Sequence, residues 1–292
     1  MLLVEHPQHS SSRERGYRNM AIIQSFFMTT SGSSGLDVEV LMIGGGGGTK
    51  GQQFIFADDF TGSNTGCGGG GAGGLYIHTA TLSSGDSQTV TIGLGGLGLN
   101  DGGDTTFTGA VAAQGGGKGA VHGASSGDGG SSGGSVDGGS LGTAVSGQGN
   151  VGGTSNESAT TPGAGGGGGK GSAGANATSG AGAAGGSGYD LANFIGGSST
   201  IVADGGGGAG NASIGANGDG STGTGNRADN TGAGARGANN TTNKRGGSGR
   251  VIVRYAGSTT KATGGDNITT ATVGGNPYVI HDFTSDGTFA VD

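Results

Sequence analysis

The sequence is short of the residues that stabilise an ordinary globular core. Tryptophan is absent, aromatic residues make up 5% of the chain, and apolar residues make up 30%. A large side-chain core cannot be built from this supply across the middle of the chain. Cys67 is the only cysteine, so an intrachain disulfide is excluded. Three prolines are too few for collagen, which needs abundant proline and glycine at every third position.

Charged residues are also scarce, at 11%, and the net charge of −7 argues against a general nucleic-acid coat. The basic residues are unevenly spread. Six of them fall within 28 positions near the end of the chain: Arg227, Arg236, Lys244, Arg245, Arg250 and Arg254. This cluster could face an acidic partner, or it could pair with the protein's own carboxylates. We favour the second interpretation.

Residues 1–36 read as a polar leader that contains one apolar segment, residues 21–28. Met20, just before it, is an alternative start of the chain. We expect the segment to be an anchor on a neighbouring protein, through Ile22, Ile23, Phe26 and Phe27. No secretion signal is visible, and no run approaches the ~18 apolar residues of a membrane span. An outward-acting protein of this kind is expected to leave its cell by lysis.

Alternating apolar residues predict strands on both sides of the glycine-rich region. The predicted strands are Asp37–Ile43, Leu75–Leu82, Thr89–Ile92, Arg250–Tyr255, Asn267–Val273, Tyr278–Phe283 and Thr288–Val291. The turn residues Ser83–Asp86 predict that the second and third strands form a hairpin. We treat residues 37–256 as a glycine-rich domain and residues 257–292 as a small β tail module.

What the chain has in excess is glycine, with 79 residues concentrated between Gly44 and Gly249. One interpretation is a disordered, low-complexity segment. The other is a set of threefold, polyglycine-II-type helices, which have no internal hydrogen bonds and can pack side by side where no Cβ intervenes. Pure glycine runs would then be interior. Mixed stretches such as Gly180–Gly188 would be at the edge, with glycine toward the interior. We predict this fold, mainly β and irregular, with almost no α-helix.

Motifs for catalysis or cofactors are not convincing. Gly93–Gly98 matches the glycine spacing of a dinucleotide site, but a loop follows where a helix is required. The lysines at glycine runs lack the serine or threonine of a phosphate-binding loop, and the five histidines lack zinc-ligand spacing. We therefore expect no enzyme activity, no cofactor and no metal site.

Two segments with aromatic residues interrupt the glycine-rich sequence. They are the best candidates for partner contacts. The candidate residues are Gln53, Phe54, Phe56, Asp58 and Asp59 in the first, and Tyr189, Asp190, Asn193 and Phe194 in the second. The alternative is that these segments are hydrophobic plugs that lock the glycine layer. The sequence does not favour one interpretation over the other.

The order of segments resembles the glycine-rich domain of phage tail fibres and tail-tip adhesins. Val40–Ile43 runs into a glycine run, a second run leads to Leu75, and the region ends at Gly246–Tyr255. The likeness covers roughly residues 37–256, and extends to residue 292 with the tail. It implies an exposed virion protein that contacts other virion proteins and a host cell-surface receptor, either a glycan or an outer-membrane protein, without binding nucleic acid.

The chain departs from that family because it lacks a long N-terminal shaft and a recognisable fibre repeat. A head fibre, a decoration protein or another virion accessory protein is therefore an alternative. A hypothesis of another class is a non-viral glycine-rich matrix or ice-binding protein, although the threonine spacing is irregular.

Overall fold

The fold is described from a computed structural model. It covers residues 35–51, 66–137, 139–156, 163–178, 180–210, 212–219, 221–223, 226–239 and 242–292. These residues belong to one unit that extends from Gly35 to Asp292. Residues 1–34 of the predicted leader, which include its anchor residues, lie outside the described residues, whereas Leu36 is the first residue of β1.

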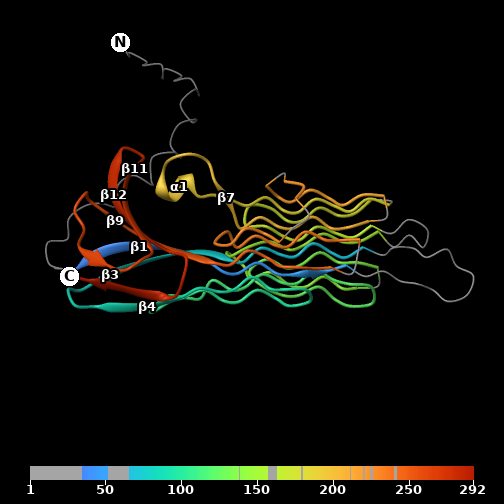
Figure 1. The fold of residues 1–292 in the computed structure, drawn as a ribbon, viewed down its shortest axis with the longest axis horizontal. Coiled ribbons are helices and arrows are strands. Elements are labelled where there is room, and N and C mark those ends of the chain that lie inside the picture. The colour runs from blue at the N-terminus through green and yellow to red at the C-terminus, as the bar shows by residue number, and fades with distance from the viewer. Residues whose placement is uncertain are drawn as a thin grey trace, which may run out of the picture. The chain divides into compact units, whose positions relative to one another are not determined.

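Two antiparallel sheets contain most of the regular structure (Figure 1). The five-stranded sheet has the order β11-β12-β9-β1-β3 and the other has the order β10-β13-β4-β5. The first comprises β1 (Leu36–Ile43), β3 (Leu75–Leu82), β9 (Arg250–Ala256), β11 (Asn267–Val273) and β12 (Asn276–Phe283). The second comprises β4 (Ser87–Thr91), β5 (Thr106–Phe107), β10 (Ala262–Thr263) and β13 (Gly287–Val291).

The smaller elements complete a mainly β fold. They are β2 (Thr49–Lys50) paired with β8 (Asn243–Lys244), β6 (Tyr189–Asp190) paired with β7 (Ile201–Val202), and the one-turn helix α1 (Ala192–Ile195). The predicted fold class is therefore confirmed. Seven predicted strands are present, and the bounds of β11 agree with the prediction at both ends.

The predicted hairpin between β3 and β4 does not form. The turn itself is present: Asp86 N–H donates to the Ser83 carbonyl oxygen at 3.0 Å, and Gly85 has a φ of 85°. However, β3 pairs with β1, whereas β4 pairs with β13 and β5, so the turn connects two different sheets. A tight turn reverses the direction of the chain, but it does not decide whether the two strands that it joins pair with each other or with other strands.

The predicted tail module, residues 257–292, does not form a separate sheet. Its strand β12 pairs with β9, and β13 pairs with β4, so both large sheets combine tail strands with strands of the glycine-rich region. The tail contributes apolar side chains such as Phe283 and Phe289 to the common core. Tail and glycine-rich region are consequently parts of one folded unit.

The second half of β1, residues 40–43, is buried on both faces, which explains its continuous apolar sequence. One face, with Val38, Val40 and Met42, packs against the second sheet in the larger apolar cluster. The opposite face, with Leu41 and Ile43, packs against the segment that carries α1. The sequence predicted the strand but neither of these contacts, because both depend on segments far away along the chain.

Glycine segments extend beyond the sheets and run side by side (Figure 1). Their backbone hydrogen bonds show a threefold period. In the segment 44–48, the N–H groups of residues 44 and 47 donate to the segment 71–74, and those of residues 45 and 48 donate to the segment 100–103. The residue between them, Gly46, donates to Gly247. Residues three apart thus face the same neighbour, as in a threefold helix without internal hydrogen bonds.

The segment Cys67–Gly74 is fully interior. Its N–H groups donate to three segments: 114–120, 165–168 and 232–235. Its carbonyl oxygens accept from three others: 44–47, 131–134 and 206–209. Six neighbours therefore surround one extended chain, and its polar backbone groups are satisfied by other backbones. This is the packing predicted for polyglycine-II-type helices.

Gly180–Gly188 is an edge segment, as predicted. A Cβ atom on Gly182 or Gly185 would lie within 3.0 Å of the backbone of the segment 205–209. Ala184 and Ser187, which alternate with these glycines at the same three-residue period, are exposed. Small side chains therefore point outward, and the bare backbone points inward.

Candidate functional site

The first predicted contact segment, with Gln53, Phe54, Phe56, Asp58 and Asp59, lies outside the described residues. The second, with Tyr189, Asp190, Asn193 and Phe194, can be followed in full. It leaves the glycine bundle at β6, forms α1 and returns at β7. This excursion, residues 189–202, lies against the outer face of the five-stranded sheet.

The excursion contains both a buried plug and exposed positions. Phe194 is 2% exposed and packs with Leu191 and Leu41 in the second apolar cluster, so its ring belongs to the core. Tyr189 is half-buried at the margin of that cluster, whereas Asn193 is exposed. For Phe194 the geometry favours the plug interpretation. Asn193 remains available to a partner.

Asp190 holds the two ends of the excursion together. Its carboxylate accepts hydrogen bonds from the N–H groups of Ala192 and Thr200, each at 3.0 Å. The pKa of Asp190 is lowered by the Ser199 side chain first, and by the Thr200 and Ala192 N–H groups next. These bonds stabilise the carboxylate and keep the exposed tip in a defined conformation.

Arg254, on β9, fixes the excursion to the sheet. Its guanidinium carbon lies 4.1 Å from the ring centroid of Phe194 and 4.6 Å from that of Tyr278. The same group forms an ion pair with Glu39 and donates a hydrogen bond to the carbonyl oxygen of Phe194. Arginine suits this position because a planar cation can stack on rings and donate hydrogen bonds at its edge.

The basic cluster near the end of the chain pairs largely with the protein's own acids, as we favoured from the sequence. Arg245 pairs with Asp229 at 2.8 Å, Arg250 with Asp282 at 2.6 Å, and Arg254 with Glu39. Arg236 donates instead to backbone carbonyl oxygens, including that of Gly215 at 2.7 Å.

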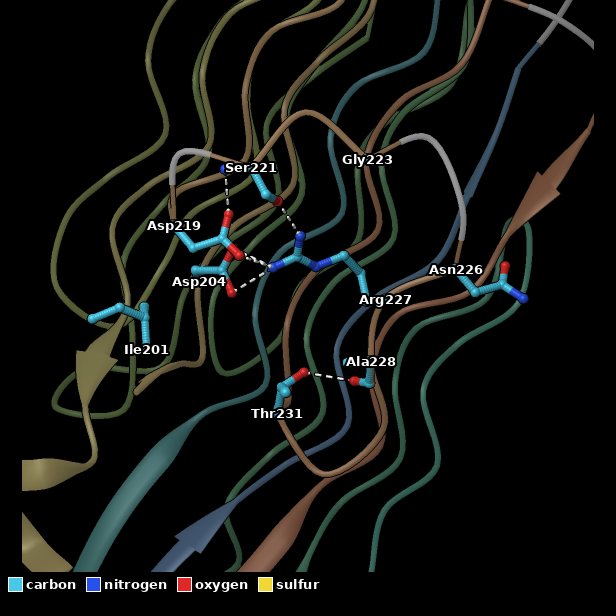
Figure 2. Close-up of a pocket in the computed structure, with 9 residues that line it drawn as sticks. All are labelled: Ile201, Asp204, Asp219, Ser221, Gly223, Asn226, Arg227, Ala228 and Thr231. Atoms are coloured by element: carbon cyan, nitrogen blue, oxygen red, sulfur yellow. Dashed lines mark hydrogen bonds and ion pairs between the residues drawn. The ribbon is translucent and has the colours of Figure 1, made fainter. Parts of the chain in front are cut away.

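Arg227 belongs to a pocket that the sequence did not indicate (Figure 2). Its Nη2 atom donates to both oxygens of Asp204, at 2.7 and 2.6 Å, and to Asp219 at 3.1 Å. Its Nη1 atom donates to the Ser221 hydroxyl at 3.1 Å. We call these four residues the Arg227 ring. Neither acid stands out in the sequence, because no spacing pattern joins them to Arg227.

Asp204 is 1% exposed, and burial raises its pKa to about 6 even though Arg227 acts in the opposite direction. Its pKa when unfolded is near 3.8. The folded protein therefore binds the proton more tightly, and this group's contribution to stability is lost as the pH rises through about 6.

We expect Asp204→Asn to remove this dependence. The stability of the wild type relative to the variant should fall between pH 4 and pH 7, with a slope of at most about one proton. Urea unfolding at a series of pH values measures the slope. Asp229→Asn, which alters an exposed pair, is the control and should follow the wild type. A stability difference between wild type and Asp204→Asn that does not change with pH would contradict the raised pKa of Asp204.

Within the described residues, no group of three or more histidine, cysteine, aspartate or glutamate side chains is placed to hold a metal ion. In the same part of the chain, no helix has the length and apolar character needed to cross a membrane.

Comparison with known proteins gives a match to a family described as a glycine-rich domain, over residues 24–256. No curated protein and no solved structure matches the chain. The matched region includes most of the glycine bundle together with strands β1 to β9. The chain belongs to the glycine-rich domain family.

Proposed function

We propose that this protein is a structural component of a phage virion, of the tail-fibre or tail-tip adhesin type, that contacts the host surface. The glycine bundle would be a rigid body that holds surface segments in fixed positions. Its partners would be other virion proteins and a glycan or outer-membrane protein of the host. It would be exposed on the particle and released by lysis, without enzymatic activity.

The observation that carries the proposal is the backbone-bonded bundle itself. Each interior segment is held by direct N–H···O=C bonds to several neighbours, such as Gly70 to Ala235 at 2.8 Å and Gly206 to Gly70 at 2.9 Å. Within the described residues the bundle contains no disulfide, and its free Cys67 is buried. Such a body does not depend on the redox state of its surroundings, which suits a particle that acts outside the cell.

The order of segments that resembles tail-tip proteins gives the proposal its biological setting. The resemblance covers residues 37–256, and the structure joins these residues into one folded unit with the tail strands. The exposed Asn193 and the carboxylate of Asp190 are the described residues that we propose for partner contact.

Immunogold labelling tests this proposal. An antibody raised against residues 35–292 should label purified particles of the phage that encodes the chain, at the tail tip. Labelling of the head would instead favour a head fibre or decoration protein. Absence of the chain from purified particles, checked by mass spectrometry, would reject a virion role. A thermal-hysteresis measurement on the pure protein would then test the ice-binding alternative.

A further inference from the structure

The Arg227 ring forms one side of a hollow whose features point to a ligand. The cavity has a volume of about 260 Å³ and is lined by Ile201, Asp204, Asp219, Ser221, Gly223, Asn226, Arg227, Ala228 and Thr231. This is slightly below the range of about 300–1,000 Å³ typical of sites for drug-sized molecules. It is therefore suited to one small ring rather than to an extended chain.

Charge in the lining disfavours anions. Two carboxylates, Asp204 and Asp219, share the guanidinium of Arg227, and among the lining residues that the structure describes no other is charged. A phosphate, sulfate or carboxylate would meet this excess of negative charge. A neutral ligand would not.

The lining of the cavity can both donate and accept hydrogen bonds. Asp219 is the carboxylate that a ligand can reach, because its side chain is 27% exposed whereas that of Asp204 is 1% exposed, and a carboxylate can accept about four bonds. Asn226 is exposed in the lining, and its side-chain amide can donate. A hydroxyl group both donates and accepts, so a ligand rich in hydroxyls meets acceptor and donor needs together. Ile201 adds an apolar surface, on which the C–H groups of a cyclic ligand can pack.

We propose that this pocket binds a single neutral polyhydroxylated ring, of the size and chemistry of a monosaccharide. Asp219 accepts a hydrogen bond from a ligand hydroxyl, and Arg227 holds the Asp219 carboxylate in place. The proposal is independent of the virion role, because it concerns ligand binding by the purified protein. Of the second contact segment, residues 189–202, only Ile201 lines the pocket.

Saturation-transfer NMR on the full chain tests the proposal, with glucose, galactose, mannose, rhamnose and N-acetylglucosamine as separate probes. At least one sugar should bind saturably. Gly223→Leu should abolish this binding without unfolding the protein, because Gly223 lines the pocket and a Cβ built on it meets nothing within 4 Å. Asp219→Ala should weaken binding at least about tenfold, a loss typical of one charged hydrogen bond.

Asp229→Ala is the matched control. It removes a carboxylate that pairs with Arg245 outside the pocket lining, and it should leave sugar affinity unchanged. Three results would overturn the proposal: no saturable binding of any of the five sugars, equal binding by wild type and Gly223→Leu, or saturable binding of methylammonium in place of the sugars.

Discussion

Replacing Gly167 by valine should prevent the glycine bundle from folding, at a cost of more than about 3 kcal/mol, in the range of severe core substitutions. Gly167 donates to Gly206 at 2.8 Å and lies against the central segment Cys67–Gly74. A Cβ atom on it would lie within 3.0 Å of the carbonyl oxygens of Gly70 and Gly69. These are backbone atoms held by their own hydrogen bonds, so no side-chain rotation can relieve the overlap.

Chemical unfolding followed by circular dichroism measures the effect of Gly167→Val. Ala184→Val is the matched control, because Ala184 is exposed at an outward position of an edge segment. Its effect should stay within about 0.5 kcal/mol, as for most surface substitutions. Equal tolerance of valine at both positions would mean that close backbone contact does not stabilise the bundle.

Replacing Arg254 by alanine should have the second largest effect, a loss of about 3 kcal/mol, because several interactions end together. The guanidinium stacks between Phe194 and Tyr278, pairs with Glu39, and donates to the backbone of the excursion. Only 13% of the Arg254 side chain is exposed, so water replaces these contacts poorly. We also expect proteolysis within the excursion, residues 189–202, to become faster.

Arg245→Ala is the control for this variant. Arg245 and Asp229 are 32% and 53% exposed, and an exposed pair contributes about 0–1 kcal/mol. Thermal unfolding and limited proteolysis of both variants give the comparison. If both arginine variants behaved alike, the stacked position of Arg254 would not be what holds the excursion.

Local sequence patterns predicted the strands because the alternation of side chains and the residues of turns are local properties. The segment Asn267–Val273 was predicted with both ends correct. The hairpin predicted for β3 was wrong, because the Ser83–Asp86 turn fits a hairpin and a connection between two sheets equally well. Similarly, Leu41 gave no sign that a distant segment with Phe194 would cover it.

The candidate sites show the same division. Asp190 and Asn193 were predicted as contact residues because they stand beside aromatic residues in an otherwise featureless sequence, and their role stays a prediction. The pocket around Arg227 was missed because neither Asp204 nor Asp219 stands out in the sequence. These two residues contact Arg227 only because separate glycine segments pack side by side, and no spacing rule predicts which segments do so.

Glycine content by itself determined the kind of interior this protein has. Long runs without side chains leave only the backbone to pack, and glycine at every third position of a mixed stretch identifies an edge. The tertiary structure alone decided which segments are neighbours, and whether they run parallel or antiparallel. The physical reason is that identical glycine segments offer identical N–H and C=O groups. Only the turns, the sheets at β1 and β9, and the few side chains such as Arg227 and Arg254 distinguish one arrangement from another.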